Sequence, residues 1–311
     1  MKYNKIIKAK KSLGQNFLKS KSVLNRIIQE GEISEKDIIL EIGPGKGALT
    51  EKLLEHARCV VAIEKDRELV VFLKEKFKKE IENKKLILIE GDCLEFEFPL
   101  SLPRRESERG SGIKNLPSIP SLVRRGGNTT YKLIANIPYN ITGAILKKFL
   151  SEDTQPERMV LLVQKEVCDR IMARDQKESI LSVSVKAYGI PKYVMKVDKK
   201  LFSPSPKVDS AILSIKNISK KNFEFPLSKN LPSIPSLVRR GGNAFEEEFF
   251  KILKTGFAHK RKVLIKNLEQ VCEREKLEEI FKSLNIDIKT RAENLSTDTW
   301  IKLTKSIFLL Y

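Results

Sequence analysis

The segment Asn136-Ile137-Pro138-Tyr139 brings together three groups that suit the binding of an amino group on a flat ring. The amide oxygen of Asn136 and the carbonyl of Pro138 can accept the two hydrogens of an exocyclic NH2 group. Pro138 has no N–H and a fixed φ, so the turn holds a defined shape, and Tyr139 can stack on the ring. The apolar run from Tyr131 predicts that the segment ends a β-strand. An ordinary turn after a strand would show the same residue pattern.

A glycine-rich turn upstream supplies a second group of candidate residues. Residues 41–47 read EIGPGKG and pass from a predicted strand into a predicted helix. Glycines at such a turn allow a sharp change of direction and a close approach of the backbone to a ligand. Glu64 ends the next predicted strand, where a carboxylate can accept hydrogen bonds from both hydroxyls of a ribose. These features fit either a nicotinamide dinucleotide or S-adenosylmethionine.

Further residues favour S-adenosylmethionine. Glu41 stands directly before the glycines, and a cofactor with a sulfonium, an ammonium and no pyrophosphate tolerates a carboxylate there. Gly91 and Asp92 close the third predicted strand, where a carboxylate can accept from the amino group of adenine. Because ligands bind at the carboxyl ends of strands in open α/β sheets, these residues should meet residues 136–139 at one edge. The joint pattern predicts a methyltransferase.

The elements that position these residues alternate between strands and helices, which indicates a parallel sheet covered on both faces. Apolar runs predict strands at 37–42, 59–64, 85–89, 131–137 and 158–164, and a later strand pair at 193–197 and 210–215. We expect an α/β fold, a Rossmann-like class I S-adenosylmethionine methyltransferase sheet in residues 1–217. A small C-terminal α-helical domain is expected in residues 218–311.

The composition of the chain points to a polyanionic partner. Its 311 residues carry a net charge of +19 and give a pI of about 9.6. Lys and Arg in this excess neutralise phosphates, so nucleic acid is the first candidate, although a generally lysine-rich proteome would leave the same balance. With only two histidines, no metal site is expected. The chain has no apolar run of membrane-spanning length, no signal-peptide core and no CxxC pair, so we expect a cytoplasmic protein without a membrane partner.

Two segments of the chain are identical. Residues 114–128 and 229–243 both read KNLPSIPSLVRRGGN, and FEFPLS precedes each copy. Solenoid repeats drift in sequence and recur at a short fixed period, which these two copies do not. Their Pro, Ser, Gly and Arg content is typical of an exposed loop. We expect insertions at about 102–128 and about 229–243 that form poorly ordered surface loops without a catalytic role.

The motifs together resemble the small-subunit (16S) ribosomal RNA adenine N6-dimethyltransferases. The matching segments span nearly the whole chain in order: GQNFL at 14–18, EIGPGKG at 41–47, GD at 91–92, NIPY at 136–139, QKEV at 164–167, FSPSPKVDS at 202–210 and RAEN at 291–294. Without the two insertions, the chain is about as long as members of that family. The insertions are its departures from the family pattern.

The resemblance implies a cofactor, S-adenosylmethionine, and a set of residues that bind it. Asn16 and Leu18 of an N-terminal arm would cover the cofactor, together with Gly43 of the glycine-rich turn. Glu64 would hold its ribose, and Asp92 would accept from its adenine amino group.

The resemblance also implies the target. The family transfers methyl groups to N6 of two neighbouring adenosines in a hairpin loop near the 3′ end of small-subunit rRNA. Asn136 would sit between the cofactor and the target base and contact both, with Pro138 beside it, and Tyr139 and Phe202 would sandwich the adenine. Phe202 precedes a proline-rich turn, so simple packing in the core is the alternative for its side chain.

Basic residues outside this edge are candidates for contacts with RNA phosphates. They are Lys207 after the FSPSP segment, and Lys260, Arg261 and Lys262 on a predicted helix of the C-terminal domain. A solvated basic face is the other interpretation of both groups. The expected partner is the small ribosomal subunit with its 16S rRNA, and we expect the protein to act as a monomer.

Three other functions compete with this one. The related large-subunit rRNA adenine methyltransferases, which give antibiotic resistance, are the nearest; FSPSPKVDSA and RAEN favour the small-subunit group. A non-catalytic ribosome assembly factor would keep the fold, but the presence of Glu64, Asp92 and Asn136 argues against lost chemistry. A nicotinamide dehydrogenase is the most distant.

Overall fold

The computed structural model describes residues 8–96, 130–224 and 244–310, and both copies of the repeated segment lie outside these ranges. The described residues divide into two compact units. The first comprises the described residues of Met1–Cys168 and Lys192–Ile218, and the second those of Asp169–Pro191 and Ser219–Tyr311. The chain therefore enters the second unit at residue 169, returns at 192 and leaves again at 219. We expected one crossing, between 217 and 218.

The extra crossing follows from the packing of α7 (Ile180–Tyr188) within the second unit. Tyr188 is buried, its ring stacks on that of Phe250 at a centroid distance of 5.9 Å, and its hydroxyl donates to Glu246. Both partners belong to α9 (Ala244–Gly256). An apolar helix such as α7 gains most stability where other elements cover its apolar face, and here α9 and α12 (Thr297–Phe308) pack on it.

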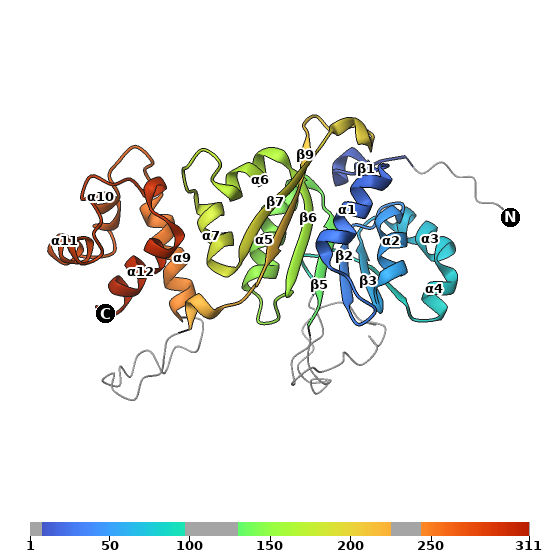
Figure 1. Cartoon of the computed structure of the whole chain (residues 1–311), viewed down its shortest axis with the longest axis horizontal. Helices are drawn as coiled ribbons and strands as arrows, with labels where there is room; N and C mark the ends of the chain where they lie inside the picture. Colours follow the sequence, from blue (N-terminus) through green and yellow to red (C-terminus); the bar gives the residue numbers. More distant parts are fainter. Residues whose placement is uncertain (1–7, 97–129, 225–243, 311) are drawn as a thin grey trace. The chain divides into compact units, whose positions relative to one another are not determined.

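The first unit is built on a seven-stranded sheet in the order β4-β3-β2-β5-β6-β9-β7 (Figure 1). The strands are β2 (Ile38–Ile42), β3 (Cys59–Glu64), β4 (Leu86–Glu90), β5 (Lys132–Asn136), β6 (Arg158–Gln164), β7 (Ile190–Val197) and β9 (Ser210–Lys216). The five neighbours β4, β3, β2, β5 and β6 run parallel to one another, and β9 is antiparallel to β6. The predicted parallel strands are thus confirmed, and every residue of β2 and β3 is buried, as expected for strands covered on both faces.

The strand order reverses at β2, because β3 and β4 follow on one side of it and β5 and β6 on the other. The carboxyl ends of β2 and β5 therefore form the topological switch point, where open α/β sheets bind their ligands. Both chemistry-bearing segments of the sequence, residues 41–47 and 136–139, leave the sheet at this point.

Helices connect the strands of this sheet: α1 (Lys21–Gly31), α2 (Ala48–His56), α3 (Arg67–Lys76), α4 (Lys78–Glu82), α5 (Thr142–Ser151) and α6 (Lys165–Met172). Helix α1 packs on α2, β5, β6 and β9, and α3 packs on β3 and β4. Side-chain caps begin α1 and α3: the Ser20 hydroxyl accepts from the N–H of Val23, and the Asp66 carboxylate from that of Glu68.

An arm precedes α1 and consists of η1 (Lys11–Leu13) and β1 (Phe17–Leu18). Strand β1 pairs antiparallel with β8 (Phe202–Ser203), which lies between β7 and β9 in the chain. Short 3-10 helices complete the first unit: η3 (Tyr139–Ile141) and η4 (Lys199–Leu201).

The second unit is helical, as the sequence predicts for the C-terminal part of the chain. Besides α7 and α9 it contains α10 (Leu264–Leu268), α11 (Arg274–Ser283), α12 (Thr297–Phe308), η5 (Lys221–Phe223) and η6 (Ala292–Asn294). Its centre is Trp300, which is fully buried and stacks on Phe257. Gly256 lies so close to Trp300 that an added Cβ would meet its ring at 2.4 Å. None of the described helices has the length and apolar character needed to cross a membrane.

Candidate active site

The glycine-rich turn takes a shape that only glycines adopt easily. Gly43, Gly45 and Gly47 have φ values of 66°, 59° and 77°, in the left-handed region. The N–H of Gly43 donates to the carbonyl of Ile63 at 2.9 Å, which ties the turn to the end of β3. A Cβ on Gly47 would lie 2.5 Å from the Phe77 ring, so this glycine also allows α2 to begin close to the residues after α3.

Glu64, the predicted ribose ligand, lies directly behind this turn. Its side chain is 6% exposed; Oε2 accepts from the N–H of Gly45 at 3.1 Å, and Oε1 from that of Asp66 at 2.9 Å. Burial raises the pKa of Glu64. An ionised carboxylate offers about four lone-pair sites, so two remain for the hydroxyls of a ribose. The carboxylate is held in place before any ligand arrives.

Glu41 has a different role from the one its charge suggests. The sequence led us to expect a carboxylate that favours a cationic cofactor, but Glu41 is 1% exposed and accepts a hydrogen bond from the Thr50 hydroxyl at 2.7 Å. Burial raises its pKa to about 8. At neutral pH it is therefore mostly uncharged, and it links β2 to α2 beneath the turn.

Asp92, the predicted adenine ligand, follows the carboxyl end of β4. Its Oδ1 accepts from the N–H of Leu94 at 2.9 Å, and its Oδ2 pairs with the Lys65 ammonium at 2.8 Å. The hydrogen bond from Lys65 lowers the pKa of Asp92, so the carboxylate is ionised. It is partly exposed, which leaves lone pairs for an amino group.

Asn136 and Pro138 stand at the carboxyl end of β5, next to the glycine-rich turn. The Asn136 amide N–H donates to the backbone carbonyl of Asn16 at 3.1 Å. This bond fixes the direction of the amide and leaves its oxygen as an acceptor, which no donor from the described residues reaches. The Pro138 carbonyl accepts one bond, from the N–H of Ile141 at 3.3 Å, and has a second lone pair. A Cβ on Gly43 would lie 3.9 Å from Pro138 Cδ, so the two segments are neighbours.

The two predicted aromatic partners of the target base are placed differently. Tyr139 is partly buried, and its hydroxyl is hydrogen-bonded to that of Ser210. Burial raises the pKa of Tyr139. Phe202 is 2% exposed and lies opposite Leu18 in the β1–β8 pair; both belong to the apolar core of the first unit. The described packing of Phe202 matches the alternative of a core side chain.

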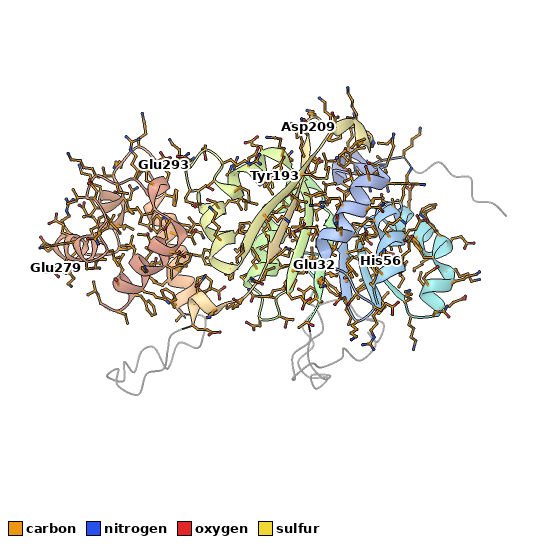
Figure 2. All side chains as sticks on the ribbon, in the orientation of Figure 1. Glu32, His56, Tyr193, Asp209, Glu279 and Glu293 are labelled. Carbon is orange, nitrogen blue, oxygen red and sulfur yellow. The ribbon has the colours of Figure 1, made fainter. Side chains whose placement is uncertain are left out.

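The predicted RNA contacts are exposed side chains. Lys207 lies in the loop between β8 and β9, which ends at Asp209 (Figure 2). The Asp209 carboxylate pairs with Lys196 at 2.8 Å and accepts from the N–H of Lys199 at 3.1 Å, so the base of this loop is held.

In the second unit, Lys260, Arg261 and Lys262 are exposed in the turn between α9 and α10, and our expectation of a helix there was wrong. The buried Asn267 holds this turn. Its amide donates to the carbonyls of Gly256 at 2.7 Å and His259 at 3.3 Å.

Sequence reasoning missed three residues that the structure brings to the site. Asp66, just after β3, accepts hydrogen bonds from the Lys10 ammonium at 2.7 Å and the Gln15 amide at 2.8 Å. The only local signal was that Asp66 precedes a helical pattern, which predicts an N-cap and nothing more.

Within residues 8–96, 130–224 and 244–310, no group of His, Cys, Asp and Glu side chains could hold a metal ion.

Comparison with known proteins identifies the family to which the chain is similar. The family model for ribosomal RNA adenine dimethylases matches residues 6–308. A ribosomal RNA small subunit methyltransferase A from Dehalococcoides mccartyi is 36% identical over 299 residues, covering 96% of this chain and 88% of the relative. Another, from Fusobacterium nucleatum, is 35% identical over 301 residues and covers 96% and 97%.

Solved structures place the fold among class I methyltransferases. A dimethyladenosine transferase from Plasmodium falciparum matches with a TM-score of 0.67 at 25% identity, covering 92% of this chain and 95% of that one. The 23S rRNA methyltransferase ErmE matches with a TM-score of 0.65 at 24% identity, covering 94% and 100%, and shows the fold alone. From these matches, the glycine-rich turn and the acceptor pair at β5, we conclude that the chain belongs to the ribosomal RNA adenine dimethylase family.

Proposed function

We propose that this protein transfers methyl groups from S-adenosylmethionine to N6 of two adjacent adenosines in a hairpin loop near the 3′ end of small-subunit rRNA. The product is N6,N6-dimethyladenosine, and the reaction belongs to small-subunit biogenesis. The observation that carries the proposal is the pair of acceptors, Asn136 Oδ1 and the Pro138 carbonyl, beside a left-handed glycine turn at the switch point of the sheet. The names of the relatives favour the small subunit over the large one.

The residues at the carboxyl edge fit S-adenosylmethionine. Glu64 keeps two lone-pair sites for ribose hydroxyls, and Asp92 is an ionised acceptor at the end of β4. The positive φ of Gly43 and Gly45 lets the backbone approach a ligand without a Cβ in the way. When bound, the cofactor supplies an electrophilic methyl group on a sulfonium.

Asn136 and Pro138 would activate the target amine. The N6 lone pair of adenine is delocalised into the ring and is a poor nucleophile. Two hydrogen bonds donated by the amino group, one to each oxygen, would pull it towards tetrahedral geometry and free the lone pair for in-line attack on the methyl carbon. The N–C bond would form as the C–S bond breaks, with S-adenosylhomocysteine as the leaving group, and the amine would then lose a proton. No base is required before transfer, so much of the rate enhancement would come from positioning. The amide of Asn136 is already oriented for this by its bond to Asn16.

Tyr139 would hold the base after it leaves its stack. Extruding a base costs a few kcal/mol, and less in a loop. Stacking on an aromatic side chain returns about 1–3 kcal/mol. The bond between the hydroxyls of Tyr139 and Ser210 ties the ring to the start of β9, so it is partly ordered in advance. Phe202 would be the second partner of the base, and at 2% exposure it offers only a small part of its side chain for that contact.

The direct test is transfer of tritiated methyl groups to purified ribosomal subunits that lack the modification, followed by nucleoside analysis. We expect label in N6,N6-dimethyladenosine of small subunits. Label confined to large subunits would move the protein to the large-subunit class. Absence of both methyl transfer and S-adenosylmethionine binding would favour an assembly factor without catalysis.

Replacing Lys260, Arg261 and Lys262 together with alanine should weaken RNA binding and reduce its salt dependence. Each phosphate contact contributes about 0.7–0.9 to the slope of log affinity against log salt, so the slope should fall by about 2 to 3. The measurement is anisotropy of a labelled rRNA hairpin over a range of salt concentrations. All three side chains are exposed, so folding should be preserved.

The control variant removes the same charge elsewhere, by alanine substitution of the exposed Lys74, Lys78 and Lys79. Its slope should stay close to that of the wild type. If the control variant lowered the slope as much as the triple variant at Lys260, Arg261 and Lys262, net charge and not the turn between α9 and α10 would determine the affinity.

A further inference from the structure

The N-terminal arm lies across the ends of several strands at the ligand-binding edge. Its Phe17 ring is so close to Gly45 that a Cβ there would meet it at 3.0 Å, and the Lys46 ammonium lies 5.0 Å from the centre of the same ring. Further along the edge, Asn16 accepts from the Asn136 amide, and β1 pairs with β8. The arm thus covers β2 and β5, where the proposed cofactor site lies.

One buried carboxylate holds the start of this arm, at Lys10 and Gln15. The Asp66 side chain is fully buried; Oδ1 accepts from the Lys10 ammonium at 2.7 Å, and Oδ2 from the Gln15 amide at 2.8 Å. Gln15 Oε1 in turn accepts from the N–H of Lys10 at 2.8 Å, which closes the group. Burial alone would raise the pKa of Asp66, but the hydrogen bonds from Lys10, Gln15 and the Glu68 N–H outweigh it and lower the pKa.

Asp66 also contacts the predicted ribose ligand, through its backbone. The N–H of Asp66 donates to Glu64 Oε1 at 2.9 Å, while the other oxygen of Glu64 accepts from Gly45, the glycine that faces Phe17 of the arm. A residue that served only as the N-cap of α3 would need one acceptor for the N–H of Glu68. It would not need a lysine and a glutamine from a distant part of the chain.

We propose that Asp66 is a positioning residue for cofactor binding, which latches the arm over the site through Lys10 and Gln15 and holds Glu64 in place. The inference rests on the proposed function and adds a residue to it. Closing the arm orders a segment, and a cofactor bound beneath it is released only when the arm opens, so the latch and the cofactor stabilise each other. Opening the latch should lower cofactor affinity and leave the chemical step unchanged.

The test compares Lys10→Met, Asp66→Asn and the double variant in the full-length protein. Calorimetry with S-adenosylmethionine should show about tenfold weaker binding for each single variant, because each loses a hydrogen bond to a charged group. The double variant should bind no more weakly than Asp66→Asn alone, since both changes open one latch. The KM for S-adenosylmethionine should rise to a similar extent, with kcat at saturation within about twofold.

Two further variants, Lys10→Arg and Lys11→Met, distinguish the latch from a purely structural role of this segment. Lys10→Arg should restore affinity, because it can still pair with Asp66, and Lys11→Met, at an exposed neighbour, should bind like the wild type. Wild-type affinity in Lys10→Met, or fully additive losses in the double variant, would overturn the latch. A wild-type protein that does not bind S-adenosylmethionine would instead overturn the proposed function.

Discussion

Replacing Asn136 with alanine should lower the rate of methyl transfer by about a hundredfold to a thousandfold, the range seen when a preorganised hydrogen-bonding partner is removed from an active site. The side chain supplies one of two acceptors for the N6 hydrogens, and its oxygen is aimed by the bond from its amide to Asn16. Affinity for S-adenosylmethionine should change by less than about fivefold, because only that one neutral bond to the arm is lost.

Single-turnover transfer to an rRNA hairpin at saturating cofactor measures the chemical step, and calorimetry measures cofactor binding. Asn140→Ala is a matched control, since Asn140 follows on the same segment but is exposed. Its transfer rate should equal that of the wild type. Asn136→Asp should keep part of the activity, because one acceptor oxygen remains. Normal turnover in Asn136→Ala would contradict the role of this residue.

The sheet and the edge that carries the site follow from local patterns in the sequence. Strands such as β2 and β3 are apolar apart from one glutamate each, and parallel strands buried on both faces have nearly that composition. Once strands alternate with helices, the rule for ligand sites places residues 41–47 and 136–139 together without knowledge of any side-chain contact. These parts of the site depend on chain order and strand direction alone.

The remainder depends on contacts between residues that are distant in sequence. The latch joins Asp66 to Lys10 and Gln15. Although Gln15 lies in the GQNFL segment, no local pattern in the sequence pairs it or Lys10 with Asp66. Phe202 lies in the core because β8 pairs with β1, a pairing of two very short strands that has no periodic signal.

Protonation is a further property that the sequence alone does not reveal. Glu41 and Glu64 are both glutamates at strand ends, yet burial raises the pKa of Glu41 to about 8 and the hydroxyl of Thr50 is its partner, whereas Glu64 faces backbone N–H groups. Glu64, which keeps lone-pair sites beside the glycine-rich turn, is therefore the residue of the two that can accept hydrogen bonds from a ligand. The two glutamates can be told apart only when the burial and the hydrogen-bond partners of each side chain are known.

Replacing Glu64 with glutamine should weaken binding of S-adenosylmethionine by about thirtyfold to a hundredfold, because hydrogen bonds to a charged acceptor are worth about 1.5–3 kcal/mol each. The amide also brings an NH2 group against the N–H of either Gly45 or Asp66, which leaves that buried donor without an acceptor. Calorimetry with the cofactor measures the loss. Glu90→Gln is the control: Glu90 is the register partner of Glu64 on β4, but it is exposed and pairs with Arg67.

The pH dependence of the same binding reaction tests the carboxylate itself. Only the ionised form offers all its lone pairs to the ribose, and burial raises the pKa of Glu64 above the ordinary value of 4.5. As pH falls from neutral, protonation should therefore weaken binding in the wild type at a pH above that value. The Glu64→Gln variant should lack this part of the profile, since it has no proton to gain, while Glu90→Gln should retain it. Profiles of the same shape in wild type and Glu64→Gln would show that another group holds the ribose.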